Sequence, residues 1–417
     1  MKDQLHILLV SYEFPPEMAT GGIGSYMYHL ASLLHHQQQH VTVFSATSSH
    51  AATSVINREH CVNYLIPAAD LESFRIKSLA VFEQFILENK VDVIESPEVG
   101  ACALEIKKKY PGIPLVVKMH TPGVLITKVS NTYQPIISKV RFVIGALLRG
   151  KFDLGYWAKH DKNKEHDPEY RICEIADMLL TPSEALKKWA VSFWKLPAEK
   201  IQVIPNPFHA DTDFLHYPVE RSTKMICFIG KLTVLKGMFA LTGAMRKVLL
   251  KHPDYRIILA GRDEAASTDI PSMQNWMENQ LGTVADRVIF KGALNRDAVK
   301  QVIAESEICV VPSLWENYPT VVLEAMAAGC AVAASNCGGI PELISHQQNG
   351  LLFNSTSEDS ISSAVEELIS DPSFRFRMAV AARKKITEEN RLAFLSEKIL
   401  LVYKALVKQF ETQRQIG

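Results

Sequence analysis

Short apolar runs alternate with helix-like stretches along nearly the whole chain, and this alternation constrains the fold more than any other feature. The earlier apolar runs lie at 6–10, 41–44, 91–95, 115–120 and 178–181, with helix-like stretches at 24–34 and 101–108. A second set has apolar runs at 225–229, 255–259, 288–291, 308–311 and 331–334, with helix-like stretches at 237–250, 273–281, 296–304 and 320–328. Such alternation is typical of α/β folds with a mostly parallel sheet. The sequence therefore predicts two doubly wound α/β domains in tandem.

The boundary between the two domains is predicted near residue 208. Pro205 and Pro207 interrupt both helix and strand patterns there. We therefore expect one domain over 1–208 and a second over 209–391. Ligands bind outside the carboxyl ends of the strands in open parallel sheets, so two such domains would place a ligand site at their strand ends.

Composition narrows the class of protein. The chain has 417 residues, 47% of them hydrophobic, which suffices for two cores. The 45 basic and 45 acidic side chains cancel, so no overall field favours nucleic acid. Seven scattered cysteines without a Cys-x-x-Cys pair argue against a disulfide framework. With neither a signal-peptide pattern nor an apolar run of about 20 residues, we expect a cytoplasmic protein.

Two glutamates frame a predicted helix start. Glu316 precedes Pro319, which suits the beginning of a helix, and Glu324 falls inside the helix-like stretch that follows. Even on one continuous helix, eight residues at a rise of about 1.5 Å each would separate the two by about 12 Å. Because a glycosidase acid and base lie roughly 5 to 9.5 Å apart, these carboxylates are not predicted to act as such a pair. They would hold different parts of one long ligand.

The segment Glu316-Asn-Tyr-Pro-Thr-Val-Val-Leu-Glu324, followed by Ala325-Met-Ala-Ala-Gly329, resembles the nucleotide-sugar site of the retaining glycosyltransferases of family 4. The resemblance implies the GT-B fold, with two Rossmann-like domains facing each other across a cleft. It also implies that Glu324 holds the ribose hydroxyls, Glu316 the donor sugar and Thr320 the phosphate end. The alternative is a surface helix with solvated carboxylates.

Two lysines follow the strand predicted at 225–229. Gly230 and Lys231 end that strand, and Lys236 precedes the next predicted helix. Two ammonium groups there can neutralise a diphosphate and stabilise it as it leaves. Family 4 enzymes usually have arginine at position 231, so bidentate phosphate contact from Lys231 is in doubt. The alternative is that both lysines are ordinary surface groups.

A glycine-rich turn and a histidine lie at the ends of other predicted strands. Gly22 and Gly24 sit between the first strand and the first helix, where backbone amides favour an anion. In the resembling family this turn faces the donor, and a histidine at the position of His120 contacts the donor sugar or polarises the acceptor region. A flexible turn and a structural hydrogen-bonding histidine are the alternatives. Glu95 and Glu98 follow another strand, and we assign them no mechanism.

Asp211 and Asp213 form an Asp-x-Asp triplet, a pattern that holds a divalent metal in another glycosyltransferase fold. The surrounding 203–214 segment instead resembles the interdomain segment of family 4 enzymes. We therefore expect a metal-independent enzyme without a cofactor, in which lysines and helix dipoles do what a cation does elsewhere. The resemblance also places the last helix, about 392–417, back on the first domain.

The stretch 136–157 combines an apolar helix with basic residues. Ile137, Val140, Ile144 and Leu148 fall on one helical face, which would suit a membrane interface or a lid. An ordinary core-facing helix is the alternative, and the pattern alone favours it. A lipid-linked or otherwise amphiphilic acceptor is the hypothesis that the basic and apolar face suggests.

Together with these patterns, the resemblance to family 4 implies a retaining hexosyltransferase. It would move a hexosyl unit from a UDP- or GDP-sugar to a hydroxyl of a glycan, lipid-linked or small-molecule acceptor, in polysaccharide or glycoconjugate biosynthesis. A nucleotide-sugar epimerase and a non-catalytic nucleotide-sugar-binding protein are the rival hypotheses. No nucleic-acid partner is expected, and contact of 136–157 with the inner face of a membrane is a further hypothesis.

Overall fold

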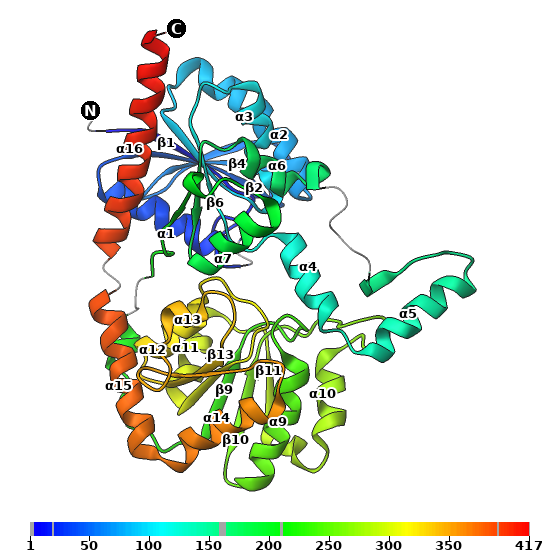
Figure 1. Cartoon of the computed structure of the whole chain (residues 1–417). Coiled ribbons are helices and arrows are strands. Elements are labelled where there is room, and N and C mark those ends of the chain that lie inside the picture. Colours follow the sequence, from blue (N-terminus) through cyan, green and yellow to red (C-terminus); the bar gives the residue numbers. More distant parts are fainter. Residues whose placement is uncertain (1–3, 19–20, 158–163, 209–211, 390–391, 417) are drawn as a thin grey trace. The chain divides into compact units, whose positions relative to one another are not determined.

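The computed structural model describes residues 4–18, 21–157, 164–208, 212–389 and 392–416, which form two compact units (Figure 1). Unit 1 comprises Met1–Gly123, Asp161–Pro207 and Arg391–Gly417, and unit 2 comprises Val124–His160 and Phe208–Asn390. The predicted first domain, 1–208, therefore needs correction, because Val124–His160 belongs to unit 2. The physical reason is contact: the Gln134 side chain donates to the Ala266 carbonyl oxygen.

Unit 1 is built on a sheet that has eight strands within the described residues, in the order β3-β4-β2-β1-β5-β6-β7-β8. All neighbours are parallel except β3 and β4, which are antiparallel. The strands are β1 (His6–Val10), β2 (His40–Thr47), β3 (Ser54–Asn57), β4 (Val62–Pro67), β5 (Val93–Pro97), β6 (Leu115–Lys118), β7 (Met178–Thr181) and β8 (Ile201–Val203).

Three helices of unit 1, α2, α6 and α7, begin at side chains that cap them. Asp70 and Ser73 form a reciprocal capping box on α2, and Ser183 caps α7. The helical segments are α1 (Gly22–His36), α2 (Leu71–Glu88), η1 (Val99–Ala101), α3 (Leu104–Lys109), α6 (Pro168–Ile175), α7 (Glu184–Trp189), η4 (Ala190–Trp194), η5 (Ala198–Lys200) and α16 (Leu392–Ile416). Helix α4 (Gly123–Thr132) begins at the last residue of the first segment of unit 1.

The helix α16 completes the core of unit 1. Its buried residues Leu395, Ile399 and Tyr403 share one apolar cluster with residues of β1 and α1. The Tyr403 hydroxyl also donates to the buried carboxylate of Glu95, which accepts a second bond of 2.7 Å from the Tyr26 hydroxyl. Unit 1 is therefore closed by a segment far away in the sequence.

Unit 2 contains a parallel sheet of six described strands, in the order β11-β10-β9-β12-β13-β14. Its strands are nearly continuous apolar runs because helices cover both faces, as in other parallel sheets. These two units confirm the predicted α/β fold class. The strands are β9 (Met225–Ile229), β10 (Arg256–Ala260), β11 (Val288–Gly292), β12 (Ile308–Val311), β13 (Ala331–Ser335) and β14 (Leu351–Phe353).

Alternate residues of each strand in unit 2 point to opposite faces of the sheet. On β9, Ile226 and Phe228 join the apolar cluster that includes residues of α9 and α14, whereas Cys227 joins the cluster that includes α12. The helical segments are α5 (Ile136–Leu148), η2 (Gly155–Trp157), α8 (Thr212–His216), α9 (Met238–Lys251), α10 (Met273–Leu281), η6 (Gly282–Arg287), α11 (Arg296–Glu305), α12 (Thr320–Ala327), α13 (Ile340–Leu343), α14 (Glu358–Ser370) and α15 (Pro372–Glu389).

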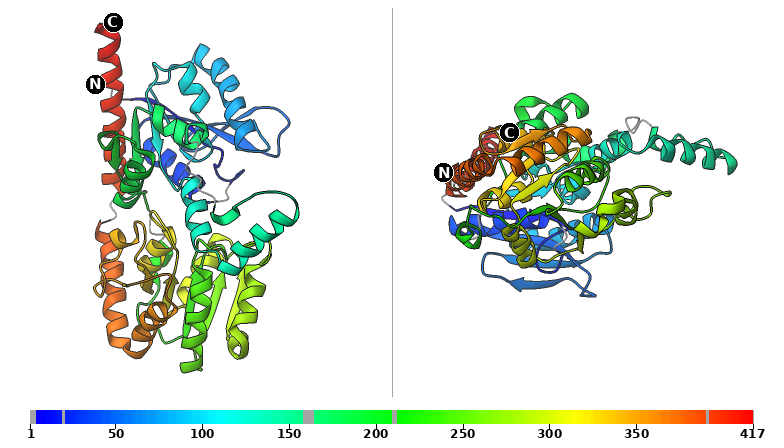
Figure 2. Two further views of the ribbon diagram at one scale, coloured as in Figure 1. Left: turned by 45° about the vertical axis from the view of Figure 1, so that its right-hand side comes forward. Right: turned by 90° about the horizontal axis from the view of Figure 1, so that it is seen from below.

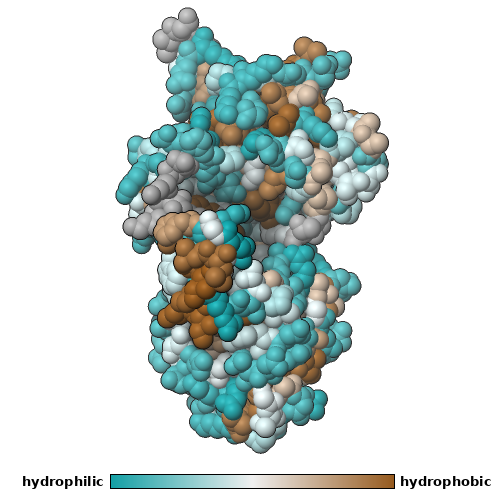
Figure 3. All heavy atoms as spheres, turned by 90° about the vertical axis from the view of Figure 1, so that its right-hand side faces the viewer, coloured by the Kyte–Doolittle hydropathy of each residue, from teal (hydrophilic) through white to brown (hydrophobic). Residues whose placement is uncertain are grey.

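Helix α5 projects from the body of unit 2 (Figure 2) and leaves its apolar face exposed (Figure 3). The exposed fractions of Ile137 and Leu148 are 66% and 84%. The prediction that this helix turns its apolar face to the core is therefore wrong. Its inward side is instead taken by Ser138 and Lys139, whose polar groups bond to neighbouring segments.

Candidate functional site

Several of the predicted site residues lie directly after strands at the topological switch point of their sheet. In unit 2 this point lies between the neighbouring strands β9 and β12. The strand order continues from β9 to β10 and β11 on one side, and from β12 to β13 and β14 on the other. In unit 1 the same reversal occurs between β1 and β5. Ligands bind outside the carboxyl ends of strands at such points. Lys231 and Lys236 follow β9, and Glu316 follows β12.

In unit 2 the structure brings Lys236 and Glu316 together. The Lys236 ammonium is paired with Glu316 Oε1, and Ser313 Oγ donates to the same oxygen over 2.8 Å. The side chains are 27% and 16% exposed, so the pair is partly shielded from water but still reachable. The pair therefore presents one cation and one hydrogen-bonding carboxylate, suited to a phosphate and to sugar hydroxyls respectively.

Backbone contacts fix this pair from two sides, and both need glycine. Gly237 has a φ of 75°, and a Cβ there would lie 2.0 Å from the Pro312 carbonyl oxygen. Gly338 has a φ of 57°, and its Cβ would lie 2.0 Å from the Glu316 carbonyl oxygen. That same oxygen accepts a bond of 2.8 Å from the Gly339 amide. No residue with a side chain fits either position without moving the backbone that carries Lys236 or Glu316.

Lys231 is held less firmly than Lys236. It follows Gly230, whose amide donates to the Ala260 carbonyl oxygen over 2.9 Å. The Lys231 ammonium is 3.4 Å from Glu264 Oε1, which also binds Arg262, and its side chain is 53% exposed. An anionic ligand would compete with Glu264 for both cations. The structure therefore places Lys231 at the same strand end as Lys236 but does not join it to the Lys236 pair.

Helix α12 carries the other two predicted residues of unit 2. Thr320 is its exposed first residue, and no described side chain caps the helix there. Glu324 lies on the second turn, where burial raises the pKa of its carboxyl group to about 7, although Arg296 and Lys300 act in the opposite direction. The prediction that Glu316 precedes the helix and Glu324 lies within it is confirmed.

Arginines hold the other end of α12. The Arg383 guanidinium donates to the carbonyl oxygens of Ala327 and Ala328 over 3.0 and 2.6 Å, and Arg221 also donates to Ala328. Cations at a helix C-terminus are favourable because they face its negative end. Arg221 and Arg383 therefore fix the axis along which Thr320 and Glu324 are presented.

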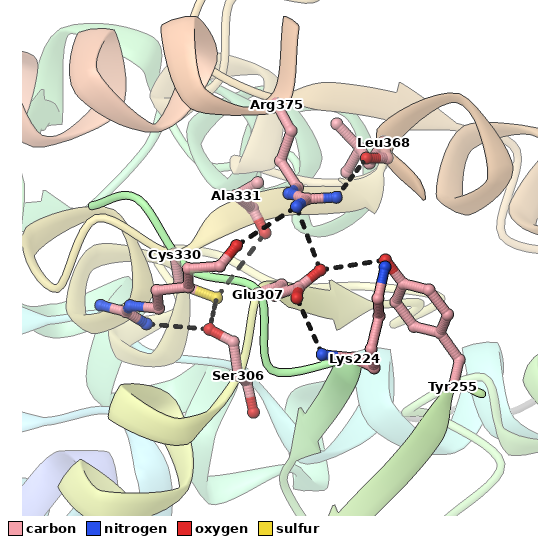
Figure 4. A network of polar contacts seen from close by, with 9 residues as sticks. Lys224, Tyr255, Ser306, Glu307, Cys330, Ala331, Leu368 and Arg375 are labelled. Carbon is pink, nitrogen blue, oxygen red and sulfur yellow. Dashed lines mark hydrogen bonds and ion pairs between the residues drawn. The ribbon is translucent and has the colours of Figure 1, made fainter. Parts of the chain in front are cut away.

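A buried network behind β12 holds this part of unit 2 (Figure 4). The Glu307 carboxylate lies 3.2 Å from the Arg375 guanidinium of α15, accepts a bond of 3.0 Å from the Tyr255 hydroxyl, and accepts the Lys224 amide over 2.8 Å. Arg375 also donates to the Leu368 carbonyl oxygen over 2.9 Å. These contacts lie at the start of β9 and β12, at the edge opposite to the lysines, so they support the sheet and do not form part of the site.

In unit 1 the glycine turn already faces a carboxylate. Gly22 begins α1, two residues earlier than the predicted helix at 24–34, so both Gly22 and Gly24 lie in its first turn. The Gly24 amide donates to Glu13 Oε2 over 3.3 Å. A carboxylate at this helix N-terminus shows that the first turn of α1 accepts an anionic group.

His120 lies beyond the end of β6, against Glu98, a glutamate that the sequence did not link to it. Its amide donates to both carboxylate oxygens of Glu98 over 2.8 Å, and its ring contacts Tyr26. Burial, and then Lys118, lower the pKa of the His120 ring to about 3, so the ring is neutral at pH 7. Among the described residues, His120 Nε2 is buried without a hydrogen-bond partner. A ligand hydroxyl could satisfy it.

Glu98 and Glu169 are the functional candidates that sequence reasoning left unassigned. Burial, and then Glu169, raise the pKa of Glu98 to about 8, while burial raises the pKa of Glu169 to about 7. Glu169 accepts the Gly123 amide over 2.7 Å. In the sequence, only the position of Glu98 after a predicted strand indicated a functional role for it. No sequence pattern indicated one for Glu169.

The Asp-x-Asp triplet falls partly outside the described residues, because Asp211 is not among them. Asp213 pairs with Lys300 over 3.1 Å, which is a structural contact within unit 2. In the part of the chain that the structure describes, no cluster of three His, Cys, Asp or Glu side chains is arranged to hold a metal ion. Within the same residues, no helix has the length and apolar character required to cross a bilayer.

Two family models match the chain. "Glycosyl transferases group 1" matches residues 213–385, and "Glycosyltransferase Family 4" matches residues 20–212. Among curated proteins, an uncharacterized glycosyltransferase of Methanocaldococcus jannaschii is 31% identical over 58% of this chain and 64% of its own length. The alpha-maltose-1-phosphate synthase of Mycolicibacterium smegmatis is 28% identical over 57% and 65%. The matches to these two relatives thus span slightly less than two thirds of their lengths.

Other relatives match over more of the chain. The glycogen synthase of Mycobacterium tuberculosis is 23% identical over 92% of this chain and 91% of its own length. Among solved structures, the sucrose-phosphate synthase of Thermosynechococcus elongatus has a TM-score of 0.73 at 19% identity, covering 97% of this chain and all of that one. HepE of Anabaena, solved in complex with UDP, has a TM-score of 0.67 at 16% identity over 96% of this chain and 100% of that one. At these identities the structures show a shared fold.

Proposed function

Because this chain belongs to the glycosyltransferases of family 4 and has their GT-B fold, we propose that it transfers a hexosyl unit from a nucleoside diphosphate sugar to an acceptor hydroxyl. The observation that carries the proposal is the Lys236 and Glu316 pair at the switch point of unit 2, four residues before α12 begins. It joins a cation for a diphosphate to a carboxylate for sugar hydroxyls at the carboxyl ends of two neighbouring strands, β9 and β12.

Five of the predicted residues of unit 2 have a chemical role in this proposal. Lys236, with Lys231, binds the diphosphate and stabilises its charge as the bond to the sugar breaks. The Thr320 amide and hydroxyl, at the positive end of α12, bind the phosphate end. Glu316 accepts hydrogen bonds from the donor sugar, and Glu324 accepts them from the ribose. Burial raises the pKa of Glu324, and hydroxyl donors from a bound ribose would stabilise its ionised form.

Gly22, Gly24 and His120 of unit 1 also have roles in this proposal. The first turn of α1 offers amides to the donor, and the neutral His120 ring accepts a sugar hydroxyl at the unpartnered Nε2. Both contacts follow from the family resemblance and from the positions of these residues at strand ends. In the free protein, Glu13 occupies the Gly24 amide that the donor would take.

The transfer is proposed to retain the configuration of the sugar. The bond from the anomeric carbon to the leaving phosphate oxygen breaks, and the acceptor oxygen bonds to that carbon from the same face. The acceptor proton passes to an oxygen of the departing diphosphate. The lysine charges and the helix amides take the part of a cation, so the reaction would need neither a metal nor another cofactor.

The donor base and the product are proposed from the relatives. HepE of Anabaena was solved with UDP-glucose, and two curated relatives are named glycogen synthase and alpha-maltose-1-phosphate synthase. We therefore place UDP-hexoses before GDP-hexoses as donors, and a glycan, lipid-linked or small sugar hydroxyl as acceptor, in polysaccharide or glycoconjugate biosynthesis. A cytoplasmic location stays a prediction.

The test is a panel of nucleotide sugars. Thermal shifts rank UDP-, GDP- and ADP-hexoses by binding. The best donor is then assayed for release of the free nucleoside diphosphate with and without sugar acceptors. NMR of the product gives the anomeric configuration, and an assay with EDTA tests independence of metal. Conversion of the donor without an acceptor would point to an epimerase, and binding without any turnover would point to a non-catalytic protein.

A further inference from the structure

Helix α5 of unit 2 has its polar and apolar faces reversed. Its inward residues Ser138, Lys139 and Ala146 are buried, and two of these are polar. The residues on its outer face are apolar and exposed, each by more than two fifths: Ile136, Ile137, Val140, Ile144, Leu147 and Leu148. A surface helix ordinarily turns its apolar face to the core. The outer face of α5 is therefore not explained by the packing of unit 2.

Polar contacts account for the inner face. Lys139 Nζ donates to the Thr132 carbonyl oxygen over 2.8 Å, at the end of α4. Ser138 Oγ lies 3.5 Å from Ser267 Oγ, and the Arg141 guanidinium lies 3.7 Å from Asp269 Oδ2. These contacts hold α5 on the loop before α10. The helix is thus fixed in place with its apolar side outward.

The apolar surface continues past the end of α5. Phe152 is 83% exposed, and Leu154 and Trp157 are each 46% exposed. The ring centroids of Phe142 and Tyr156 are 5.4 Å apart, so the segment after the helix folds back beside it. Figure 3 shows the band of hydrophobic residues that results. Exposed apolar patches of this kind on a soluble domain mark a binding surface.

The charge around this band is positive, although the whole chain is neutral. Residues 124–157 contain five basic side chains and one acidic one, namely Lys128, Lys139, Arg141, Arg149, Lys151 and Asp153. Arg149 and Lys151 are exposed, directly beyond the last apolar turn of α5. A basic rim on an apolar helix complements a surface that is apolar below and anionic above, as a bilayer of acidic lipids is.

We propose that α5 and residues 149–157 dock unit 2 on the surface of an anionic lipid bilayer. The helix is about 20 Å long at about 1.5 Å per residue, and lies in the plane of the headgroups with its apolar face toward the acyl chains. Phe152 and Trp157 sit at the same level, where aromatic side chains are favoured. A second copy of the chain fits less well, because the same basic rim would then face itself. The proposal does not rest on the sugar transfer.

The first experiment is co-sedimentation of the full chain with vesicles. One set is phosphatidylcholine alone, and in the other about a third of the lipid is phosphatidylglycerol. We expect binding to the anionic vesicles, weaker binding to the neutral ones, and release as salt is raised. Reversing two charges in Arg149→Glu, Lys151→Glu should lower partitioning at least about twenty-fold, because each basic residue contributes about five-fold.

A second variant tests the apolar face, and matched controls test position. Ile144→Ser, Leu148→Ser should weaken binding about ten-fold or more, because several buried methylene groups are lost. Leu250→Ser, Leu401→Ser changes two leucines that are 54% and 66% exposed elsewhere. Lys384→Glu, Lys408→Glu reverses two charges on α15 and α16. Both control variants should bind like the wild type, and thermal unfolding checks that all four variants fold.

Three results would overturn the proposal. The wild type could stay in the supernatant with anionic vesicles, or the α5 variants could bind as well as their controls. Light scattering could instead show a dimer that Ile144→Ser, Leu148→Ser converts to a monomer without any vesicle binding, and the face would then join copies of the chain. Thermal shifts with nucleotide sugars read the donor site separately, so failure here leaves the proposed transfer intact.

Discussion

Replacing Lys236 tests the central pair of the candidate site, and a double-mutant cycle with Glu316 measures it. The pair is 27% and 16% exposed, which lies between two known cases. Exposed pairs contribute about 0.2–1 kcal/mol, and removing one partner of a buried pair costs about 3–5 kcal/mol. We therefore expect Lys236→Met to lower the free energy of unfolding by about 1–2 kcal/mol. Glu316→Gln in the same background should cost little more, because the carboxylate is then already unpaired.

The effect of Lys236→Met on activity should exceed its effect on stability. Loss of one charge that stabilises a leaving group costs about 2.7–4 kcal/mol, a fall of about 10²–10³ in the rate of transfer. For stability, Lys231→Met is the matched control, because that ammonium lies 3.4 Å from Glu264 on a side chain that is 53% exposed. It should change the free energy of unfolding by less than about 0.5 kcal/mol.

Urea unfolding measures the change in stability, and initial rates of nucleoside diphosphate release measure the change in activity. The reasoning fails if Lys236→Met keeps the wild-type rate, or if the two single substitutions of the cycle add without coupling. Lys236→Arg keeps the charge and should recover part of the rate, which a purely steric role for Lys236 would not explain.

Three further predictions concern residues around the pair and the closure of unit 1. Gly338→Ala should destabilise by more than the roughly 1–2 kcal/mol of a left-handed residue, since its Cβ would lie 2.0 Å from a backbone oxygen. Gly292→Ala, at a φ of 64° with no atom within 4 Å of the new Cβ, measures the cost of positive φ alone in chemical unfolding. Glu324→Gln should weaken donor binding in calorimetry. Because burial raises the pKa of Glu324 from 4.5 to about 7, the wild type should also lose stability relative to this variant as pH rises through that range, and a flat difference would contradict it. Tyr403→Phe removes a donor to buried Glu95 and should cost about 1.5–3 kcal/mol in thermal unfolding, whereas no loss would mean that Glu95 is protonated without it.

The sequence predicted most strands that are long apolar runs and missed β3, β4, β8 and β14. The strands of unit 2 from β9 to β13 were predicted within about one residue, because parallel strands covered on both faces read as apolar runs. β3, with alternating half-buried and exposed residues, and β8, with three residues, were too short or too polar to stand out. The grouping of Val124–His160 with unit 2 depends on contacts such as Arg141 with Asp269, which no local pattern encodes.

For the site, spacing predicted which residues follow which strand but not how they pair. Glu316, Thr320 and Glu324 fall where expected around the start of α12. That Lys236 rather than Lys231 meets Glu316 depends on the turn at Gly237, whose fit against Pro312 is a tertiary property. The partners of His120 come from Glu98, 22 residues away in the sequence, and could not be found from periodicity.

The shared core of β1, α1 and α16 has a consequence for the order in which the chain is made. Leu5 and Tyr403 belong to one cluster although nearly the whole polypeptide separates them. As the ribosome works from the amino end, the apolar side of α1 must wait, uncovered, until the last segment emerges. The amino-terminal half is thus the first to be synthesised and the last to be finished, and a nascent chain halted before residue 395 would offer that surface to chaperones.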